Sequence, residues 1–245
     1  MSGGYSAFAY FYDALTGNIS YKERADYFDR LIKKHGGQKG VLLDLACGTG
    51  SLSEEMSKLG YDVIGVDGSV DMLSEAMNKK IESGLDIQYI CQDMTELDLY
   101  GTVDAAYCSL DGINYIPPAE LPVLFYKLSC FIRPSGLFLF DIRSPEWIES
   151  MDGQVYVDEQ DDVLCLWRSE ISREEDCIYY DMDIFSKKGS LWERSEEEHI
   201  EHIYSFEYLE NLLLSKGFCN VKIIGDGPQS DLGRITISAE RVLDK

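Results

Sequence analysis

A chain of 245 residues with 45% hydrophobic side chains can bury one large core, which predicts one domain carrying an insertion rather than two equal domains. Its 44 acidic residues against 22 basic ones give a net charge of −22, and no basic cluster is longer than two lysines. Because Lys and Arg contacts to phosphates supply most non-specific affinity for nucleic acid, this charge disfavours a nucleic-acid partner.

The cysteines and the hydropathy pattern restrict the class of protein further. Seven cysteines, an odd number and never spaced C-x-x-C, argue against a disulfide framework or a zinc knuckle. No stretch approaches the roughly 18 apolar residues of a membrane span, and the N-terminus has no basic region typical of a signal peptide. We therefore expect a cytoplasmic protein with reduced thiols and no membrane partner.

Residues 5–35 place aromatic and aliphatic side chains at helical spacing and end at Gly36-Gly37, which is typical of a helix stop. This segment predicts a helical cap over a ligand mouth. Strand and helix signals then alternate through 41–46, 51–59, 62–66, 70–83, 86–91, 103–108, 119–132 and 137–142. Such alternation predicts an α/β fold with a parallel, doubly wound sheet.

The pattern changes at about residue 154, where period-2 stretches separated by charged turns predict three or four antiparallel strands. Ser205 then has the sequence context of a helix cap, Gly217 of a helix stop, and 221–224 and 234–238 of two final strands. The predicted organisation is a core with helical cap over 1–150, an antiparallel β insertion over 151–204 that serves as substrate lid, and the remainder of the core over 205–245.

The segment from Val41 to Asp67 predicts a nucleotide-cofactor cradle. A short apolar run is followed by Gly48 and Gly50, which permit a tight turn and a close approach of a ligand to the main chain. The helix that starts near Ser51 directs its N-terminal N–H groups toward that ligand. Asp67 ends the next strand, where a carboxylate can accept both hydroxyls of a ribose.

The motif Asp44-x-x-x-Gly48-x-Gly50, with Asp67 and Gln92-Asp93-Met94 ending the next two strands, resembles the class I S-adenosylmethionine (SAM)-dependent methyltransferases. Ala46 stands where that family usually has glycine. The opening Tyr5-x-x-Phe8-Ala-x-x-Tyr12-Asp13 and Leu110-Asp-Gly-Ile-Asn-Tyr115 further resemble a bacterial subgroup, the YqeM-like methyltransferases. The resemblance implies a doubly wound, seven-stranded Rossmann-like methyltransferase sheet with an antiparallel β insertion after strand 5, with SAM as cofactor and S-adenosylhomocysteine (SAH) as product.

The resemblance also implies roles for individual residues around the cofactor. The turn should hold the methionyl end, Asp67 the ribose, and Asp93 the adenine amino group, while Asp44 orients the glycine loop. The remaining candidates close on the cofactor, flank its adenine or lie near its methyl group. The full cofactor-binding set is Tyr5, Asp44, Ala46, Cys47, Gly48, Gly50, Asp67, Gly68, Met72, Asp93, Met94, Ser109 and Leu110.

The acceptor side is expected to begin where the fourth strand ends. Tyr12, Asp111 and Tyr115 are the candidate catalytic residues, and Asn114 should line the acceptor pocket; the alternative is that they cap turns or pack. In the insertion, Trp167, Arg168 and Tyr180 are candidate substrate residues, with core packing as the alternative. His199 is a candidate pocket base, with a solvated, charged strand as the alternative. A metal site with His202 is disfavoured because strand residues three apart face opposite sides.

These observations predict in-line methyl transfer from SAM to a small-molecule acceptor, for which the acidic balance and the many tyrosines favour an amine. Three alternatives stay open: a protein or RNA acceptor, a protein that binds SAM without turnover, and an NAD(P)-dependent oxidoreductase. The last rests on Gly48-x-Gly50-x-x-Ser53, which nearly matches a dinucleotide-binding loop. Either a monomer or a homodimer is compatible with the sequence.

Overall fold

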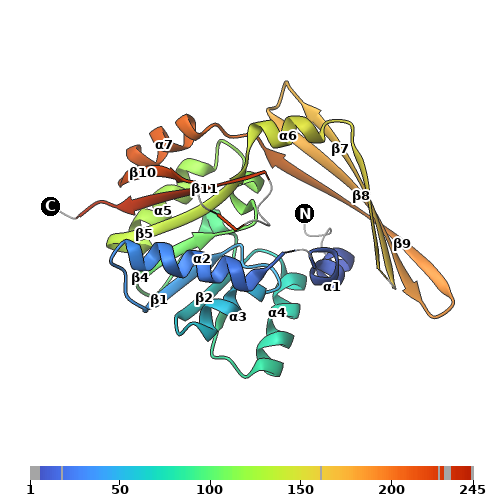
Figure 1. Cartoon of the computed structure of the whole chain (residues 1–245), viewed down its shortest axis with the longest axis horizontal. Helices are drawn as coiled ribbons and strands as arrows, with labels where there is room; N and C mark the ends of the chain where they lie inside the picture. The colour runs from blue at the N-terminus through green and yellow to red at the C-terminus, as the bar shows by residue number, and fades with distance from the viewer. Residues whose placement is uncertain (1–5, 18, 161, 226, 229–232, 244–245) are drawn as a thin grey trace.

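The computed structural model describes residues 6–17, 19–160, 162–225, 227–228 and 233–243 (Figure 1). A seven-stranded sheet forms its centre in the order β10-β11-β5-β4-β1-β2-β3. Five strands are parallel; β11 runs antiparallel to both of its neighbours. The strands are β1 (Val41–Leu45), β2 (Asp62–Asp67), β3 (Gln88–Cys91), β4 (Val103–Cys108), β5 (Ile132–Arg143), β10 (Phe218–Ile224) and β11 (Arg234–Arg241). The predicted doubly wound methyltransferase sheet is confirmed.

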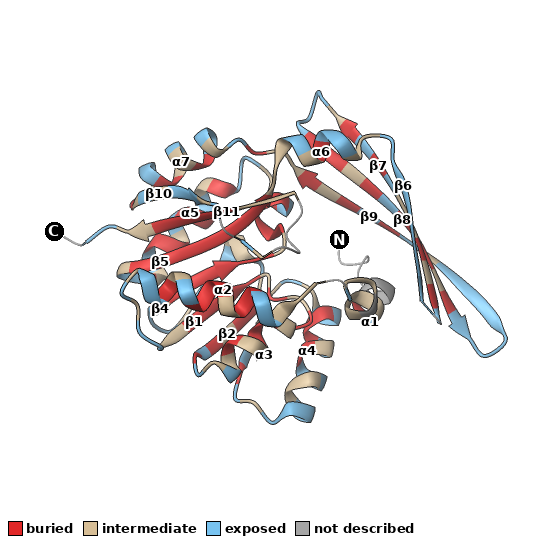
Figure 2. Cartoon of the chain, in the orientation of Figure 1, coloured by how far each residue is buried: buried red, intermediate tan, exposed pale blue. Residues whose placement is uncertain are grey.

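Helices cover both faces of this sheet, because its central strands are apolar on both sides. On one face, Leu124 of α5 and Leu213 of α7 pack into a core with Phe138 and Phe140 of β5. On the other, Phe28 of α2 and Met56 of α3 pack on alternate residues of the same strands. Figure 2 shows the resulting buried centre. The helices are α2 (Tyr21–Lys34), α3 (Ser51–Lys58), α4 (Val70–Ser83), α5 (Leu121–Phe131) and α7 (Phe206–Ser215).

Serine caps fix where several of these helices begin. The Ser69 hydroxyl accepts the Met72 N–H at the start of α4, directly after β2. The Ser205 hydroxyl accepts the Tyr208 N–H at the start of α7, as its sequence context predicts. The cap of α4 matters for the site, because it turns the chain sharply at the end of β2.

The insertion between β5 and α7 forms a second, four-stranded antiparallel sheet in the order β6-β7-β8-β9. Its strands are β6 (Val155–Gln160), β7 (Val163–Ser172), β8 (Cys177–Lys188) and β9 (Leu191–His202), preceded by the short helix α6 (Pro145–Met151). The predicted antiparallel strands are therefore present, whereas α6 was not predicted. Figure 1 shows this sheet standing beside the central one.

Helix α1 (Ser6–Leu15) lies between the two sheets and joins them. Ala9 of α1, Met72 of α4, and Cys165 and Met182 of the insertion share one small hydrophobic cluster. The predicted N-terminal helical segment is thus two helices, α1 and α2, with α1 packed against the insertion. None of the helices in the described ranges is long and apolar enough to cross a membrane.

Candidate active site

The turn between β1 and α3 has the backbone conformation that its glycines allow. Ala46, Gly48 and Gly50 have φ of 57°, 54° and 74°, in the left-handed region that favours glycine. A Cβ on Gly50 would overlap the Tyr89 hydroxyl, so glycine is required there. Ala46 adopts the same conformation with a side chain, which explains why glycine is usual at this position of the fold.

Asp67 ties this turn to the end of β2. Its Oδ2 accepts the Gly48 N–H at 2.8 Å, and its Oδ1 accepts the Ser69 N–H at 2.8 Å. Each carboxylate oxygen has a further lone pair, so two ribose hydroxyls can still donate to it. Burial raises the pKa of Asp67, although the two N–H donors oppose that rise.

Asp44 lies beneath the turn and is buried in β1. The Ser53 hydroxyl donates to its Oδ2 at 2.5 Å, which connects β1 to the first turns of α3. Burial raises the pKa of Asp44 to about 7, while hydrogen bonds from Ser53 and Tyr107 oppose the rise. Its position suits the predicted role of orienting the glycine loop.

Asp93 and Met94 follow β3 and begin a single 3-10 turn, η1 (Met94–Glu96). The main-chain N–H and the hydroxyl of Thr95 both donate to Asp93, at 2.7 and 2.6 Å, and both contacts use Oδ1. One carboxylate oxygen therefore holds the turn, and the other is available to an adenine amino group.

One cavity of about 1070 Å³ joins these elements at the carboxyl ends of β1, β2, β3 and β4. Eleven of the thirteen predicted cofactor-binding residues line it; Gly50 shapes the turn without lining the cavity, and Tyr5 falls outside the described residues. The lining also includes Tyr12, Tyr21, Ser51, Gly112, Tyr115, Gln92 and the β9 residues Glu196, Glu197 and Glu198. Sequence reasoning did not single out Tyr21 or these three glutamates.

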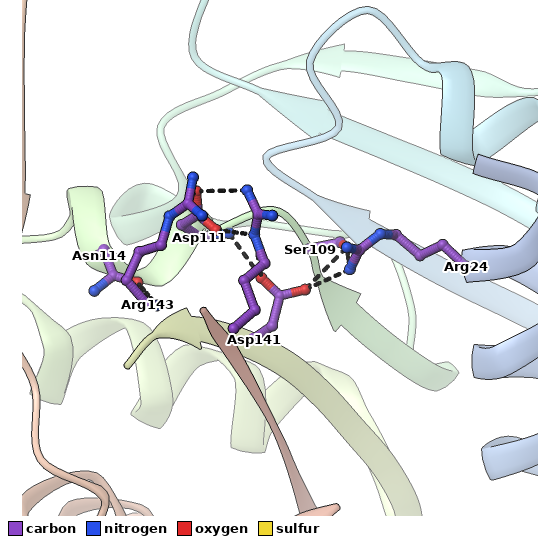
Figure 3. Close-up of polar contacts among 7 residues, drawn as sticks. Arg24, Ser109, Asp111, Asn114, Asp141 and Arg143 are labelled. Atoms are coloured by element: carbon purple, nitrogen blue, oxygen red, sulfur yellow. Dashed lines mark hydrogen bonds and ion pairs between the residues drawn. The ribbon is translucent and has the colours of Figure 1, made fainter. Parts of the chain in front are cut away.

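Asp111 belongs to a buried cluster of ion pairs (Figure 3) and does not line the cavity. Its carboxylate pairs with Arg143 at 3.1 Å and with Arg234, and its N–H donates to Asp141 at 2.8 Å. On the other side of Asp141, Arg24 of α2 completes the cluster at 2.7 Å. Arg24, Asp141 and Arg234 carried no local sequence signal, because their pairing joins three distant segments.

This cluster corrects the predicted role of Asp111. Burial alone would raise the pKa of Asp111, but Arg234 and Arg143 outweigh it and hold that pKa below its ordinary value. A carboxylate held ionised by two guanidinium groups is a poor proton acceptor. Leu110 and Asp111 both have left-handed φ, of 59° and 64°, and Asp111 does not line the cavity.

Asn114 is also turned away from the cavity, contrary to the prediction. Its Nδ2 donates to the His202 carbonyl at 2.8 Å, and its Oδ1 accepts the Arg143 N–H at 3.1 Å. Both ends of the amide are used to join the short helix η2 (Gly112–Tyr115) to β9 and β5. Asn114 is fully buried and does not line the cavity.

The candidate substrate residues of the insertion lie outside the cavity lining. Arg168 pairs with Asp183, Trp167 packs against the α1 cluster, and Tyr180 packs with Ile148 and Ile178. The packing alternative therefore describes Trp167 and Tyr180, whereas Arg168 is an exposed residue in an ion pair. His199 is buried behind Tyr115, whose ring meets it edge-on with centroids 5.9 Å apart.

Tyr12 and Tyr115 line the cavity, and their place on its acceptor side stays a prediction. Burial raises the pKa of Tyr12 well above its ordinary value, and Tyr21 and Asp111 add to the rise. Tyr12 therefore stays a neutral phenol, able to exchange hydrogen bonds with a ligand but not to act as a phenolate base near neutral pH.

Comparison with known proteins identifies the chemistry of this cavity. Residues 42–136 match the methyltransferase domain family. Over 226 residues the chain is 31% identical to YqeM, a predicted methyltransferase of Bacillus subtilis (strain 168), covering 91% of this chain and 89% of YqeM. The chain belongs to the YqeM-like, SAM-dependent methyltransferases.

Solved structures agree with this methyltransferase family in fold. A SAM-dependent methyltransferase from Clostridium acetobutylicum is 28% identical with a TM-score of 0.84, covering 98% of this chain and 99% of that one. The SAM-bound amino pentose methyltransferase CalS10 from Micromonospora echinaspora is 20% identical with a TM-score of 0.77, covering 94% and 96%. The second likeness shows the fold alone.

The methyltransferase uses SAM, and the cavity has the donors and acceptors that this cofactor requires. The N-terminus of α3 and the turn present main-chain N–H groups, the Asp67 carboxylate has free lone pairs, and Asp93 keeps one oxygen for the adenine end. Gly48, where a Cβ would meet no neighbouring atom within 4 Å, leaves the approach to the main chain open. The dinucleotide oxidoreductase alternative has no support in this family.

Proposed function

We propose that the enzyme transfers the methyl group of SAM to the nitrogen of a small, amine-bearing acceptor. The observation that carries this proposal is the composition of the cavity beyond the cofactor residues. There Tyr12, Tyr21 and Tyr115 line the same cavity as Glu196, Glu197 and Glu198. Glu197 is 8% exposed, so this carboxylate faces the cavity from a largely buried position.

Carboxylates and aromatic faces are the groups that attract an ammonium ion. A cation over an aromatic ring gains about 0.5 to 2 kcal/mol, and a carboxylate in a partly desolvated cavity adds a stronger Coulombic attraction. The net charge of −22 raises the local concentration of cations and repels phosphate-bearing polymers. CalS10, an amino pentose methyltransferase with the same fold, acts on an amine-bearing small molecule, which supports the proposal.

The chain's own residues contribute mainly positioning. When bound, SAM supplies a methyl group on a positively charged sulfur. Asp67 and the glycine turn would hold the cofactor, while Ser109 and Leu110 form the wall between it and the acceptor. Glu197 would hold an amine by its N–H groups, and α1 with the insertion sheet would exclude water from the acceptor end.

The insertion would then act as one wall and the lid of the acceptor site, in keeping with its predicted role. Its contribution comes from one strand, β9, which supplies Glu196, Glu197 and Glu198 to the cavity. In this proposal 1–150 and 205–245 hold the cofactor, and 151–204 decides which acceptor enters.

The test is SAH formation from SAM with separate acceptor panels: small amines, small carboxylic acids and phenols, bulk tRNA, and a protein extract. We expect turnover with members of the amine panel and none with tRNA. Glu197→Gln should raise the KM for the amine at least about tenfold with little effect on SAM binding, because a charged hydrogen bond is worth about 1.5 to 3 kcal/mol. Turnover confined to tRNA or to the extract would replace this proposal by its runner-up, a macromolecular acceptor.

A further inference from the structure

Three ionisable side chains occupy alternate positions on the inward face of β9. Glu197, His199 and Glu201 are 8%, 5% and 4% exposed, whereas Glu198 between them is exposed. Glutamate is rarely buried in this way, because taking a carboxylate out of water costs several kcal/mol unless partners compensate it. The row runs from the cavity, where Glu197 is part of the lining, to the ion-pair cluster around Asp111.

Glu201 is the most deeply buried member of this row. Its Oε2 has no hydrogen-bond partner among the described residues. The groups that face Glu201 come from every element around it: Tyr115 and Asp111 of the η2 turn, Arg143 of β5, Arg234 of β11 and Tyr180 of β8. On its own strand His199 lies two residues away, and its direct pairing partner on β8 is Ile178.

Tyr115 connects this buried carboxyl to the cavity. The residue is 37% exposed and lines the cavity, and its hydroxyl faces Glu201, whose pKa it lowers. The ring of Tyr115 rests edge-on against His199, which fixes its orientation. A single hydroxyl therefore lies between the acceptor space and a carboxyl that water does not reach.

We infer that Glu201, acting through the hydroxyl of Tyr115, receives the proton that an acceptor amine must lose before its nitrogen can be methylated. This inference rests on the proposed amine acceptor. The ammonium N–H bond breaks and its proton forms a bond to Tyr115 Oη, while the proton of Tyr115 passes to the Glu201 carboxylate. The amine is left neutral with its lone pair free, Tyr115 is unchanged, and Glu201 becomes a neutral acid. After product release the proton returns to solvent by the same route.

The charges around Glu201 suit this exchange. Burial raises the pKa of Glu201 to about 8, and Asp111 adds to the rise, while Arg143, Arg234 and the Tyr115 hydroxyl oppose it. A simple alkylamine has a pKa of about 10, close to that of a lysine side chain. The pKa of such an amine exceeds that of an ordinary carboxyl by about 6 but that of Glu201 by only about 2, so proton transfer to Glu201 is much less unfavourable.

Two measurements test the inference separately. In the first, protein labelled with ¹³C at the glutamate carboxyls and saturated with SAH is titrated by NMR, and Glu201 is assigned by its absence in Glu201→Gln. We expect a midpoint near pH 8 that moves upward in Tyr115→Phe, because the hydroxyl that favours the ionised form is lost. Glu193→Gln, an exposed carboxyl at the far end of the same strand, should leave the signal unchanged.

In the second, methylamine, ethanolamine, glycine, putrescine and glucosamine serve as probes, and kcat is measured from pH 6 to 10. In the wild type kcat should rise with pH and level off above pH 8. Glu201→Gln and Tyr115→Phe should each lower kcat about 100-fold at pH 7.5 without raising the Kd for SAM. Both should recover toward pH 10, where the amine deprotonates unaided; a merely structural defect would not recover.

The outcomes separate this inference from the proposed function. A Glu201 midpoint between pH 4 and 5, a midpoint that Tyr115→Phe leaves unchanged, or variants whose loss of kcat is the same at every pH would each overturn the role of Glu201 even if amines are methylated. A Glu201 midpoint near pH 8 together with no turnover of any amine would instead contradict the proposed acceptor. Proton uptake from an amine would then be excluded as well.

Discussion

The main-chain N–H of Gly48 donates to Asp67 at 2.8 Å, so the glycine turn after β1 and the acid at the end of β2 form a single hydrogen-bonded unit. The second oxygen of Asp67 holds the start of the next turn through Ser69 at 2.8 Å. The carboxylate therefore shapes the cavity before any ribose reaches it. This dual use needs an acceptor at both oxygens, which an amide side chain cannot supply.

Replacing Asp67 by Asn should weaken SAM binding at least about tenfold, measured by calorimetry. The amide NH₂ cannot accept from Gly48 or from a ribose hydroxyl, and each lost charged hydrogen bond costs about 1.5 to 3 kcal/mol. Asp62→Asn, at the exposed start of the same strand, is the matched control and should bind SAM normally. Equal affinities in the two variants would refute the ribose assignment.

Asp111→Asn should destabilise the fold rather than remove a catalytic base. It leaves Arg143 and Arg234 without their counter-charge in the buried cluster, and breaking such a pair typically costs about 3 to 5 kcal/mol. Urea denaturation measures the loss, with the exposed Asp181→Asn on β8 as control. A variant with unchanged stability and a lost kcat would restore Asp111 as a candidate base.

The contribution of Asp111 to the unfolding free energy should depend on pH. Because the pKa of Asp111 is lowered in the folded protein, its stabilisation is fully present above the ordinary Asp value of about 4 and is lost as pH falls through the folded pKa. The difference in unfolding free energy between wild type and Asp111→Asn should therefore be constant from pH 5 to 8 and shrink in acid.

The cofactor half of the site was predictable because its signals are local. The apolar strand before Gly48, the glycine turn and the acids that end β2 and β3 each lie within a few residues of one another. The parallel topology then brings them to one edge of the sheet. The antiparallel character of the insertion was predictable for the same reason, since period 2 is visible in β7 and β8.

The acceptor half was predictable only in part, because it depends on backbone turns and long-range pairs. Leu110 and Asp111 are non-glycine residues in the left-handed conformation, and Asp111 lies outside the cavity lining. The residue types do not predict this conformation. Glu197 lies between two exposed glutamates, and Glu201 ends the same charged run, which resembles a solvated strand. Only the packing of β9 against η2 shows which of these carboxyls are buried.

Helix α1 is held to the cofactor turn by a polar latch. Asp13 accepts the Thr49 hydroxyl at 2.8 Å and the Ser51 hydroxyl at 3.1 Å, and it pairs with Lys79 of α4. Lys79→Met should lower the unfolding free energy by less than about 1 kcal/mol, because these side chains are partly solvated. It should nevertheless speed SAM dissociation, measured by stopped flow, since Tyr12 of α1 lines the cavity.

Lys22→Met is the matched control for this latch, because Lys22 pairs with Asp26 at 2.7 Å on the exposed face of α2, away from the turn. The dissociation rate of SAM should be the same in this variant as in wild type. An equal rate in Lys79→Met would mean that α1 does not restrain the bound cofactor.

Asp44→Asn should change how stability depends on pH. Burial raises the pKa of Asp44 to about 7 in the folded protein, above the ordinary value of about 4. The folded state therefore binds this proton more tightly than the unfolded state, and the contribution of Asp44 to stability is full below about pH 4 and declines as pH rises to 7. An Asn cannot ionise but keeps an oxygen for the Ser53 hydroxyl. In urea denaturation, the unfolding free energy of the variant relative to wild type should therefore rise between pH 5 and 8. A difference that stays constant over this interval would mean that Asp44 is already ionised in the folded protein at pH 5.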